Sequence, residues 1–182
     1  NTGVPAFASI LHLLIDPNNS NILYAGTYRD GVLKSSDGGN NWSEINTGMI
    51  ATRVYDLAID SRNSNTIYAA TWQDGVYKST NGGASWVAVN SGLGSINVRS
   101  LAMDSKNPNI LYVGTTVGVY KTTNGGTAWN PANSGLTGVP NTLVVDPKNS
   151  QVIYAGGANL FKSTDSGATW HQAASTMHIQ NI

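Results

Sequence analysis

Aromatic, charged and amide side chains stand together at two short segments of this 182-residue sequence, Tyr28-Arg29-Asp30 and Trp72-Gln73-Asp74. Arg53, Tyr55 and Arg99 stand ahead of later apolar runs. Aromatic rings beside such polar groups are typical of sites that grip a sugar or a peptide. The plainer interpretation is a set of solvated loop tips, since polar loop residues are exposed by default. The binding candidates are Tyr28, Arg29, Asp30, Tyr55, Trp72, Gln73 and Arg99.

Glycoside hydrolysis would need two facing carboxylates about 5–10 Å apart. Asp56 with Asp74 is the alternative catalytic pair, and Asp30 could take the place of Asp74. The three histidines show no metal-ligand spacing, and the sequence has no Ser-His-Asp arrangement or phosphate-binding glycine loop. We therefore expect no metal and no cofactor. An enzyme is possible, but no motif supports one.

Four phrases that end in tryptophan set the period of the chain. Their tryptophans are 44, 43 and 41 residues apart, at positions 42, 86, 129 and 170. Between them recur an apolar run that ends in Asp, an Asn-rich turn, a strand with Tyr, a tight turn and a strand with Lys. Four short strands joined by tight turns at this period predict a β-propeller blade. We expect an all-β propeller segment over 1–182, with four-stranded antiparallel blades at 9–49, 53–93, 97–136 and 139–177.

The apolar runs predict strands that are sandwiched inside the fold. Leu13–Asp16 and Leu57–Asp60 carry apolar side chains at consecutive positions, so both faces of each strand should be covered. In such a blade the first and third turns lie on one rim, whereas the middle turn and the crossover lie on the other. The binding candidates would then lie on the rim opposite the tryptophan phrases.

The tryptophan phrases have a local structural explanation. An Asp or Asn can accept bonds from its own turn, a Ser or Thr adds another bond, a Gly allows positive φ, and the Trp buries a large apolar body. Asn stands in the two middle phrases and cannot act as an acid, so the role is structural rather than catalytic. The residues are Ser35, Asp37, Gly39, Trp42, Ser79, Asn81, Gly83, Trp86, Thr122, Asn124, Gly126, Trp129, Ser163, Asp165, Gly167 and Trp170.

The pattern Ser/Thr-x-Asp/Asn-x-Gly-x-x-Trp resembles the Asp-box, or bacterial neuraminidase repeat. This repeat occurs in sialidases, xyloglucan-degrading glycosidases, sortilin-type receptors and photosystem assembly factors. In the glycosidases that it resembles, the active site lies on the face opposite the boxes. The sialidase site needs a triad of arginines and a Glu beside a Tyr nucleophile. Here the sole glutamate, Glu44, follows a tryptophan phrase, so the sialidase assignment fails.

The composition of the chain excludes several classes of partner and site. Ten basic and ten acidic residues cancel, so no long-range field favours nucleic acid. Charged residues make up only 11% of the chain, and cysteine is absent, which excludes disulfides and thiolate metal sites. No apolar run approaches the ~20 residues of a membrane span. No signal peptide is visible in residues 1–15, and one would have to lie upstream. We expect an extracellular or cell-surface location.

The repeat phase at both ends favours a larger assembly. Asn1–Val4 matches Asn46–Met49, which follows a fourth strand, and His178–Ile182 matches the lead-in to another first strand. Further blades of the same polypeptide or a second copy of the chain would complete the propeller. The expected function is a non-catalytic scaffold of a secreted or surface microbial protein that binds protein or glycan. The alternative is a xyloglucanase- or sialidase-like glycoside hydrolase module.

Overall fold

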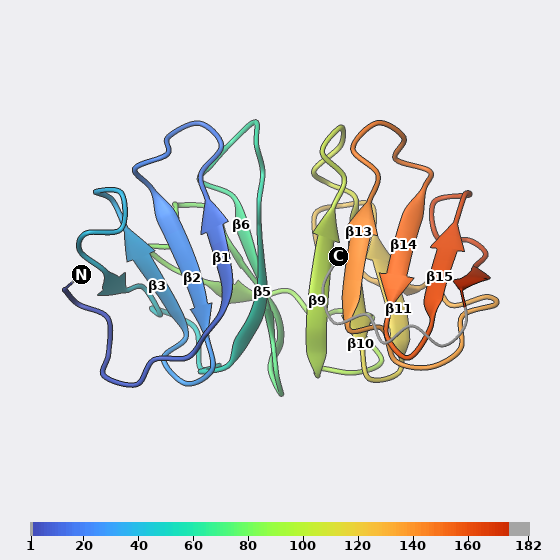
Figure 1. Ribbon diagram of the computed structural model, residues 1–182, viewed down its shortest axis with the longest axis horizontal. Coiled ribbons are helices and arrows are strands. Elements are labelled where there is room, and N and C mark those ends of the chain that lie inside the picture. The colour runs from blue at the N-terminus through green and yellow to red at the C-terminus, as the bar shows by residue number, and fades with distance from the viewer. Residues whose placement is uncertain (1, 175–182) are drawn as a thin grey trace. The chain divides into compact units, whose positions relative to one another are not determined.

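The computed structural model describes residues 2–174 as four antiparallel sheets of four strands each (Figure 1). His178 and the end of the predicted blade 139–177 lie outside the described residues. The strands are β1 Ile10–Ile15, β2 Leu23–Thr27, β3 Val32–Ser35, β4 Ser43–Glu44, β5 Val54–Ile59, β6 Ile67–Thr71, β7 Gly75–Ser79, β8 Val87–Ala88, β9 Val98–Met103, β10 Leu111–Thr115, β11 Gly118–Thr122, β12 Asn130–Pro131, β13 Thr142–Val145, β14 Ile153–Gly156, β15 Leu160–Ser163 and β16 His171–Ala174.

Each sheet is a simple meander, because every strand pairs with the next one in the chain. We call β1–β4, β5–β8, β9–β12 and β13–β16 the first to fourth blades. The outer strand has only two residues in the first three blades and four residues in the last. In the third blade that strand ends at Pro131, which has no N–H to donate to a longer ladder.

The chain divides into two compact units, Asn1–Val89 with the first two blades and Asn90–Ile182 with the other two. A single propeller segment over 1–182 stays a prediction. No helix long and apolar enough to cross a membrane occurs among residues 2–174.

The tryptophan phrases form one hydrogen-bonded turn four times, and we call residues 35–42, 79–86, 122–129 and 163–170 the Trp-closed turns. In the first, Ser35 Oγ donates to Asp37 Oδ1 at 2.9 Å and accepts from Gly39 N–H at 2.9 Å. Asp37 Oδ1 also accepts from Asn41 N–H at 2.8 Å. In the second turn Asn81 Oδ1 takes the same place, with Ser79 Oγ and Ser85 N–H both at 2.9 Å. An amide oxygen therefore replaces the carboxylate, as the structural interpretation requires.

Within each unit, the Trp of the second Trp-closed turn closes the seam between the two blades. Trp86 is 2% exposed and packs in a cluster with Tyr24, Val32 and Leu57, while its Nε1 donates to the Ile45 carbonyl at 2.7 Å. In the second unit Trp170 packs against residues of the third blade, and its Nε1 donates to the Ala132 carbonyl at 2.8 Å. The predicted burial of these two tryptophans is confirmed.

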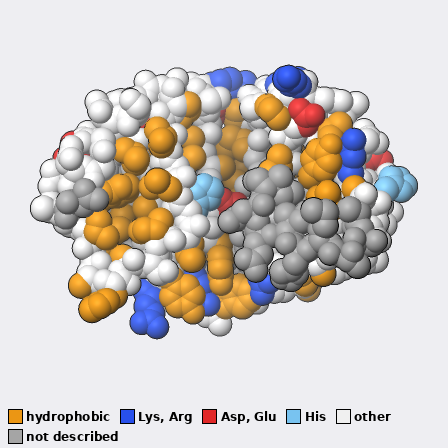
Figure 2. Space-filling model, viewed as in Figure 1, with side chains coloured by type: hydrophobic (Ala, Val, Ile, Leu, Met, Phe, Trp, Pro, Cys, Tyr) orange, Lys and Arg blue, Asp and Glu red, His pale blue; other side chains and the backbone are white. Residues whose placement is uncertain are grey.

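The predicted coverage of both faces is wrong for the first strand of the first blade. Leu13 is 54% exposed and Ile15 is 53% exposed, whereas Leu57 and Leu143 at the matching position are 3% and 5% exposed. Leu57 and Leu143 face a preceding blade within their own units, whereas no described blade of the first unit precedes β1. Hydrophobic side chains accordingly gather at the surface over the first sheet in Figure 2.

Candidate binding rim

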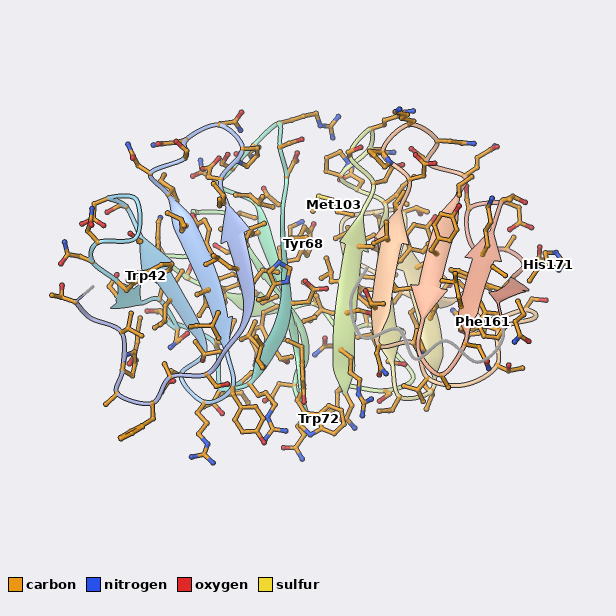
Figure 3. The ribbon with its side chains drawn as sticks, in the orientation of Figure 1. Trp42, Tyr68, Trp72, Met103, Phe161 and His171 are labelled. Carbon is orange, nitrogen blue, oxygen red and sulfur yellow. The ribbon has the colours of Figure 1, made fainter. Side chains whose placement is uncertain are left out.

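The middle turns and the lead-ins to the first strands lie together on one rim of the first unit. Tyr28 N–H donates to the Ser9 carbonyl at 2.9 Å, and Trp72 N–H donates to the Arg53 carbonyl at 3.1 Å. Gly31 N–H crosses from the first blade to the Thr52 carbonyl at 2.9 Å. These backbone bonds hold the side chains of both segments on the same surface. We call this surface the lead-in rim, and Trp72 marks it at the lower edge of Figure 3.

The other rim carries the Trp-closed turns and the Asn-rich turns. Gly38 N–H donates to the Asn21 carbonyl at 2.9 Å, and Gly82 N–H does the same to the Asn65 carbonyl at 2.9 Å. A backbone hydrogen bond therefore joins the first turn of each of these blades to its third turn. We call this surface the turn rim.

A stacked arginine and tyrosine lie on the lead-in rim. The guanidinium of Arg53 lies 3.9 Å from the centroid of the Tyr28 ring, and that of Arg29 lies 5.7 Å from the same centroid. A cation over a ring face at this distance is attracted by the ring quadrupole. The two arginines thus add positive charge to an aromatic surface that is only partly buried.

An aromatic pair, Tyr55 with Trp72, lies on the same rim. Tyr55 and Trp72 meet edge to face, with ring centroids 6.0 Å apart and an interplanar angle of 70°. Both side chains are half-buried, so part of each ring remains accessible to a ligand. Gln73, the next residue, is exposed and has a φ of 75°, which is uncommon for a residue other than glycine.

A hollow of about 380 Å³ opens beside Tyr28. The residues that line it include Phe7, Tyr28, Arg29 and Asp30. The side chain of Phe7 is 104% exposed, and its backbone has a φ of 68°. Phe7 is absent from the sequence-based candidates because it has no counterpart in the other repeats. The available signal was a lone aromatic residue in the segment that precedes the first apolar run.

Asp56, one of the two alternative catalytic carboxylates, is paired with a histidine. Its Oδ1 forms an ion pair with His12 Nδ1 and accepts a hydrogen bond from Leu57 N–H at 2.8 Å. Burial of His12 acts to lower its pKa, but the hydrogen bond and the charge of Asp56 outweigh it, and the pKa is raised above 6.5. His12 lies on β1 and Asp56 on β5, so the pair bridges the first two blades.

Two other candidates, Arg99 and Asp30, have local hydrogen-bond partners. Arg99 belongs to the second unit, where its Nη1 donates to Asn141 Oδ1 at 2.8 Å. Asp30 lies in the turn after β2, where its N–H donates to Thr27 Oγ1 at 2.7 Å. Among residues 2–174 no three His, Asp or Glu side chains cluster as metal ligands.

The sequence matches no protein-family model and no curated protein sequence. Solved structures do match it. A crystal structure of an ancestral GH74 enzyme is 24% identical, with a TM-score of 0.78 over 93% of this chain and 24% of that chain. The GH74 xyloglucanase of Xanthomonas campestris is 20% identical, with a TM-score of 0.68 over 89% of this chain and 29% of its own. YCF48 bound to D1 peptide is 14% identical, with a TM-score of 0.58 over 96% of this chain and 85% of its own.

The chain has the β-propeller fold. The four antiparallel sheets and these structural neighbours together confirm the predicted fold class. At such low identity the likeness concerns the fold alone. The chain spans about a quarter of the length of the two GH74 structures.

Proposed function

We propose that this chain is a non-catalytic β-propeller scaffold of a secreted or cell-surface microbial protein, within a larger propeller or assembly. Its lead-in rim would bind a partner protein or a glycan. The observation that carries this proposal is the stack of Arg53 on Tyr28 at 3.9 Å. The stack presents a cation and an aromatic body together, beside the edge-to-face pair of Tyr55 and Trp72.

The chemistry of the rim suits an extended polar ligand. Aromatic rings offer flat apolar faces to a sugar ring or to a peptide side chain, and arginine donates in a fork to carboxylates or carbonyls. The hollow of about 380 Å³ beside Tyr28 gives such a ligand a place to enter. A peptide has a precedent in this fold, since one structural neighbour is YCF48 bound to D1 peptide.

The rival function is glycoside hydrolysis, which two GH74 neighbours favour at the level of fold. It would use Asp56 and Asp74 as its carboxylates. The pairing of Asp56 with His12 argues against it, because a carboxylate already engaged by a histidine ring is poorly placed to donate or accept the proton of a scissile bond.

A binding screen against glycan arrays and peptide libraries tests the proposal. Arg53→Gln should weaken capture of any ligand found by about tenfold or more, because arginine is among the residues whose loss costs most at binding surfaces. The matched control is Arg62→Gln, which removes the same charge from the turn rim, where Arg62 Nε lies 3.7 Å from Asp60 Oδ1. Equal losses for both variants, or no ligand for the parent chain, would contradict a binding role for the rim.

Hydrolysis assays on xyloglucan and sialosides test the rival in parallel. The scaffold proposal expects no turnover. Turnover that disappears in Asp56→Asn or Asp74→Asn, while the fold persists by circular dichroism, would establish the enzyme instead.

A further inference from the structure

Two of the four Trp-closed turns contain an asparagine that glycine follows directly. In the second turn Asn81 precedes Gly82, and in the third turn Asn124 precedes Gly125, whereas the other two turns carry Asp at this position. Asparagine is thermolabile, and most of all before glycine, because glycine has no side chain to hinder attack of its nitrogen on the asparagine side chain. Both asparagines are exposed, so water reaches the place of this reaction.

The turn accepts an amide or a carboxylate with the same bonds. Asn81 Oδ1 accepts from the hydroxyl two residues before it and the N–H four residues after it, both at 2.9 Å, and Asp165 Oδ1 accepts the corresponding bonds at 2.8 Å. At the second atom, Asn81 Nδ2 donates to Ser85 Oγ at 2.9 Å, whereas Asp165 Oδ2 accepts from Thr169 Oγ1 at 2.5 Å. A hydroxyl can accept or donate, so Ser85 can serve a carboxylate at position 81 as well.

A backbone hydrogen bond engages the nitrogen of each glycine. Gly82 N–H donates to the Asn65 carbonyl at 2.9 Å, and Gly125 N–H donates to the Asn109 carbonyl at 3.0 Å. The nitrogen must lose this hydrogen to attack, so the Trp-closed turn must first separate from the Asn-rich turn. Local opening of an exposed turn costs less free energy than global unfolding. The reaction should therefore be slowed by the fold without being abolished.

The third turn holds its asparagine less firmly than the second. Asn124 Oδ1 accepts from Thr122 Oγ1 at 2.8 Å and from Ala128 N–H at 3.0 Å. Within residues 2–174 the side-chain nitrogen of Asn124 has no hydrogen-bond partner, because Ala128 stands where the second turn has Ser85. The side chain of Asn124 therefore has one restraint fewer against rotation towards the nitrogen of Gly125.

We propose that Asn81 and Asn124 are deamidation sites at which the fold retains the aspartate product. The nitrogen of Gly82 attacks Cγ of Asn81, a new N–C bond forms, the bond from Cγ to the side-chain nitrogen breaks, and ammonia leaves with the hydrogen of the glycine N–H. Water then opens the cyclic succinimide, at Cγ to give aspartate or at the backbone carbonyl carbon to give isoaspartate. Asn124 and Gly125 react in the same way.

The Trp-closed turn distinguishes these two products. Aspartate leaves the backbone unchanged and presents Oδ1 to the same donors. Isoaspartate inserts a methylene into the backbone, which displaces Gly83 N–H from the Ser79 hydroxyl and Ser85 N–H from its acceptor in the second turn. An open isoaspartate turn can close to the succinimide again, whereas the hydrogen-bonded aspartate is held. Aspartate should therefore accumulate in the folded chain.

Conversion changes the charge of the turn rim and its response to acid. Each conversion adds one negative charge to a chain whose formal net charge is 0 at pH 7. Hydrogen bonds lower the pKa of Asp37 and of Asp165 to about 2 in the turns that already carry aspartate. The converted turns should gain the same stabilisation, which is present above about pH 4 and lost as the pH falls towards 2. None of these steps depends on the ligand of the lead-in rim.

The first test incubates the 182-residue chain at mildly alkaline pH, folded or unfolded in urea, and separates aspartate from isoaspartate by peptide mapping. The folded chain should react about tenfold more slowly or less, because the turn must open first. It should convert Asn124 before Asn81 and give a higher ratio of aspartate to isoaspartate than the unfolded chain. Equal ratios in the two samples, or a folded chain that stays unconverted after the unfolded chain has reacted completely, would overturn the proposal.

The fourth turn supplies a matched control for the attacking nitrogen. Ser166 follows Asp165 there with a φ of 60°, so the turn accommodates serine at this position. Gly82→Ser should stop conversion at Asn81 during the time in which Asn124 of the same chain converts, because a side chain hinders the attack. Circular dichroism verifies the fold. Conversion of Asn81 at the parent rate would contradict attack by the nitrogen of residue 82.

The hydroxyl of Ser85 is tested by copying the third turn into the second. Ser85→Ala should raise the rate at Asn81 towards the rate at Asn124 and leave Asn124 unchanged. An unaltered rate at Asn81 would overturn the predicted order of the two sites.

Direct replacement tests whether the turns accept the product. Asn81→Asp and Asn124→Asp should each melt at pH 7 no lower than the parent chain, because the carboxylate keeps the bonds of the amide oxygen. A lower melting temperature in either variant would overturn retention of aspartate by the fold.

Discussion

The two rims of the first unit differ in how closely the repeats resemble one another. On the turn rim, Asp37 and Asn81 accept the same bonds in two successive turns, and the hydroxyl groups of Ser35 and Ser79 hold both turns in the same way. On the lead-in rim, the matching turns carry different side chains, Tyr28-Arg29 in one blade and Trp72-Gln73 in the next. Repetition therefore marks the contacts that build the blades, and variation marks the rim for which we propose a binding role.

The largest expected effect concerns tryptophans at matching positions of the turn rim. Trp86→Ala should lower the free energy of unfolding by about 4 kcal/mol, because it empties a well-packed seam. Trp42→Ala should cost about half of that or less, since Trp42 is only half-buried and bonds within its own turn. Urea unfolding followed by circular dichroism measures both. Equal losses would show that the local turn, rather than the seam, accounts for the stabilisation.

The next effect tests how closely the backbones approach at the seam. Gly48 has a φ of +82°, and a Cβ there would lie 2.3 Å from the Trp86 carbonyl oxygen. Gly48→Ala should therefore cost about 3 kcal/mol or more, from left-handed strain and the clash together.

Gly138 is the control for that substitution. It has a φ of +86° but nothing within 4 Å of the added carbon, so Gly138→Ala should cost only about 1 kcal/mol. Thermal unfolding of both variants separates strain from clash. A similar cost at both positions would contradict the close approach at Gly48.

A smaller effect is the loss of stability at acid pH, which aspartate in a Trp-closed turn should cause and asparagine should not. The Asn41 N–H, the Asn41 side chain and the Ser35 hydroxyl lower the pKa of Asp37 to about 2. The Thr169 hydroxyl and N–H, with the Ser163 hydroxyl, do the same for Asp165. Because the folded-state pKa is the lower one, the stabilisation is present above about pH 4 and is lost as the pH falls towards 2.

The double variant Asp37→Asn/Asp165→Asn should therefore lose less stability between pH 5 and pH 2 than the parent chain. Melting temperatures across that range measure the difference. Asp30→Asn, on the lead-in rim, controls for the removal of a carboxylate. An unchanged acid profile in the double variant would show that these two turns do not contribute to the pH dependence.

The smallest effect concerns the bridge between the blades. Asp56→Asn should lower the pKa of His12, because the partner that raises it becomes uncharged. In the parent chain the stabilisation from this pair is complete below about pH 6.5 and declines as the pH rises through the raised pKa of His12. Titration of the His12 ring protons by NMR measures the shift. No change in that titration would remove Asp56 as the partner of His12.

The repeat made most of the fold predictable from sequence. The strand order, the turn residues and the structural role of Asp37 and Asn81 follow from local hydrogen bonding and from the spacing of Trp42, Trp86, Trp129 and Trp170. The hydrogen bonds of each turn join residues no more than four positions apart, and the spacing of the repeat supplies the strand order. The binding role of Tyr28 and Trp72 stays a prediction.

Other features were decided only by tertiary structure. The stack of Arg53 on Tyr28 joins two blades, the pairing of His12 with Asp56 joins two more strands, and Phe7 lies beside Tyr28 although it belongs to no repeat. The exposure of Leu13 could not be read from a run of apolar residues, since that run is buried wherever a preceding blade packs on it. The physical reason is that local turns fold from neighbouring residues, whereas a seam depends on which blade packs against which, and four repeats with the same residues at matching positions do not encode that alone.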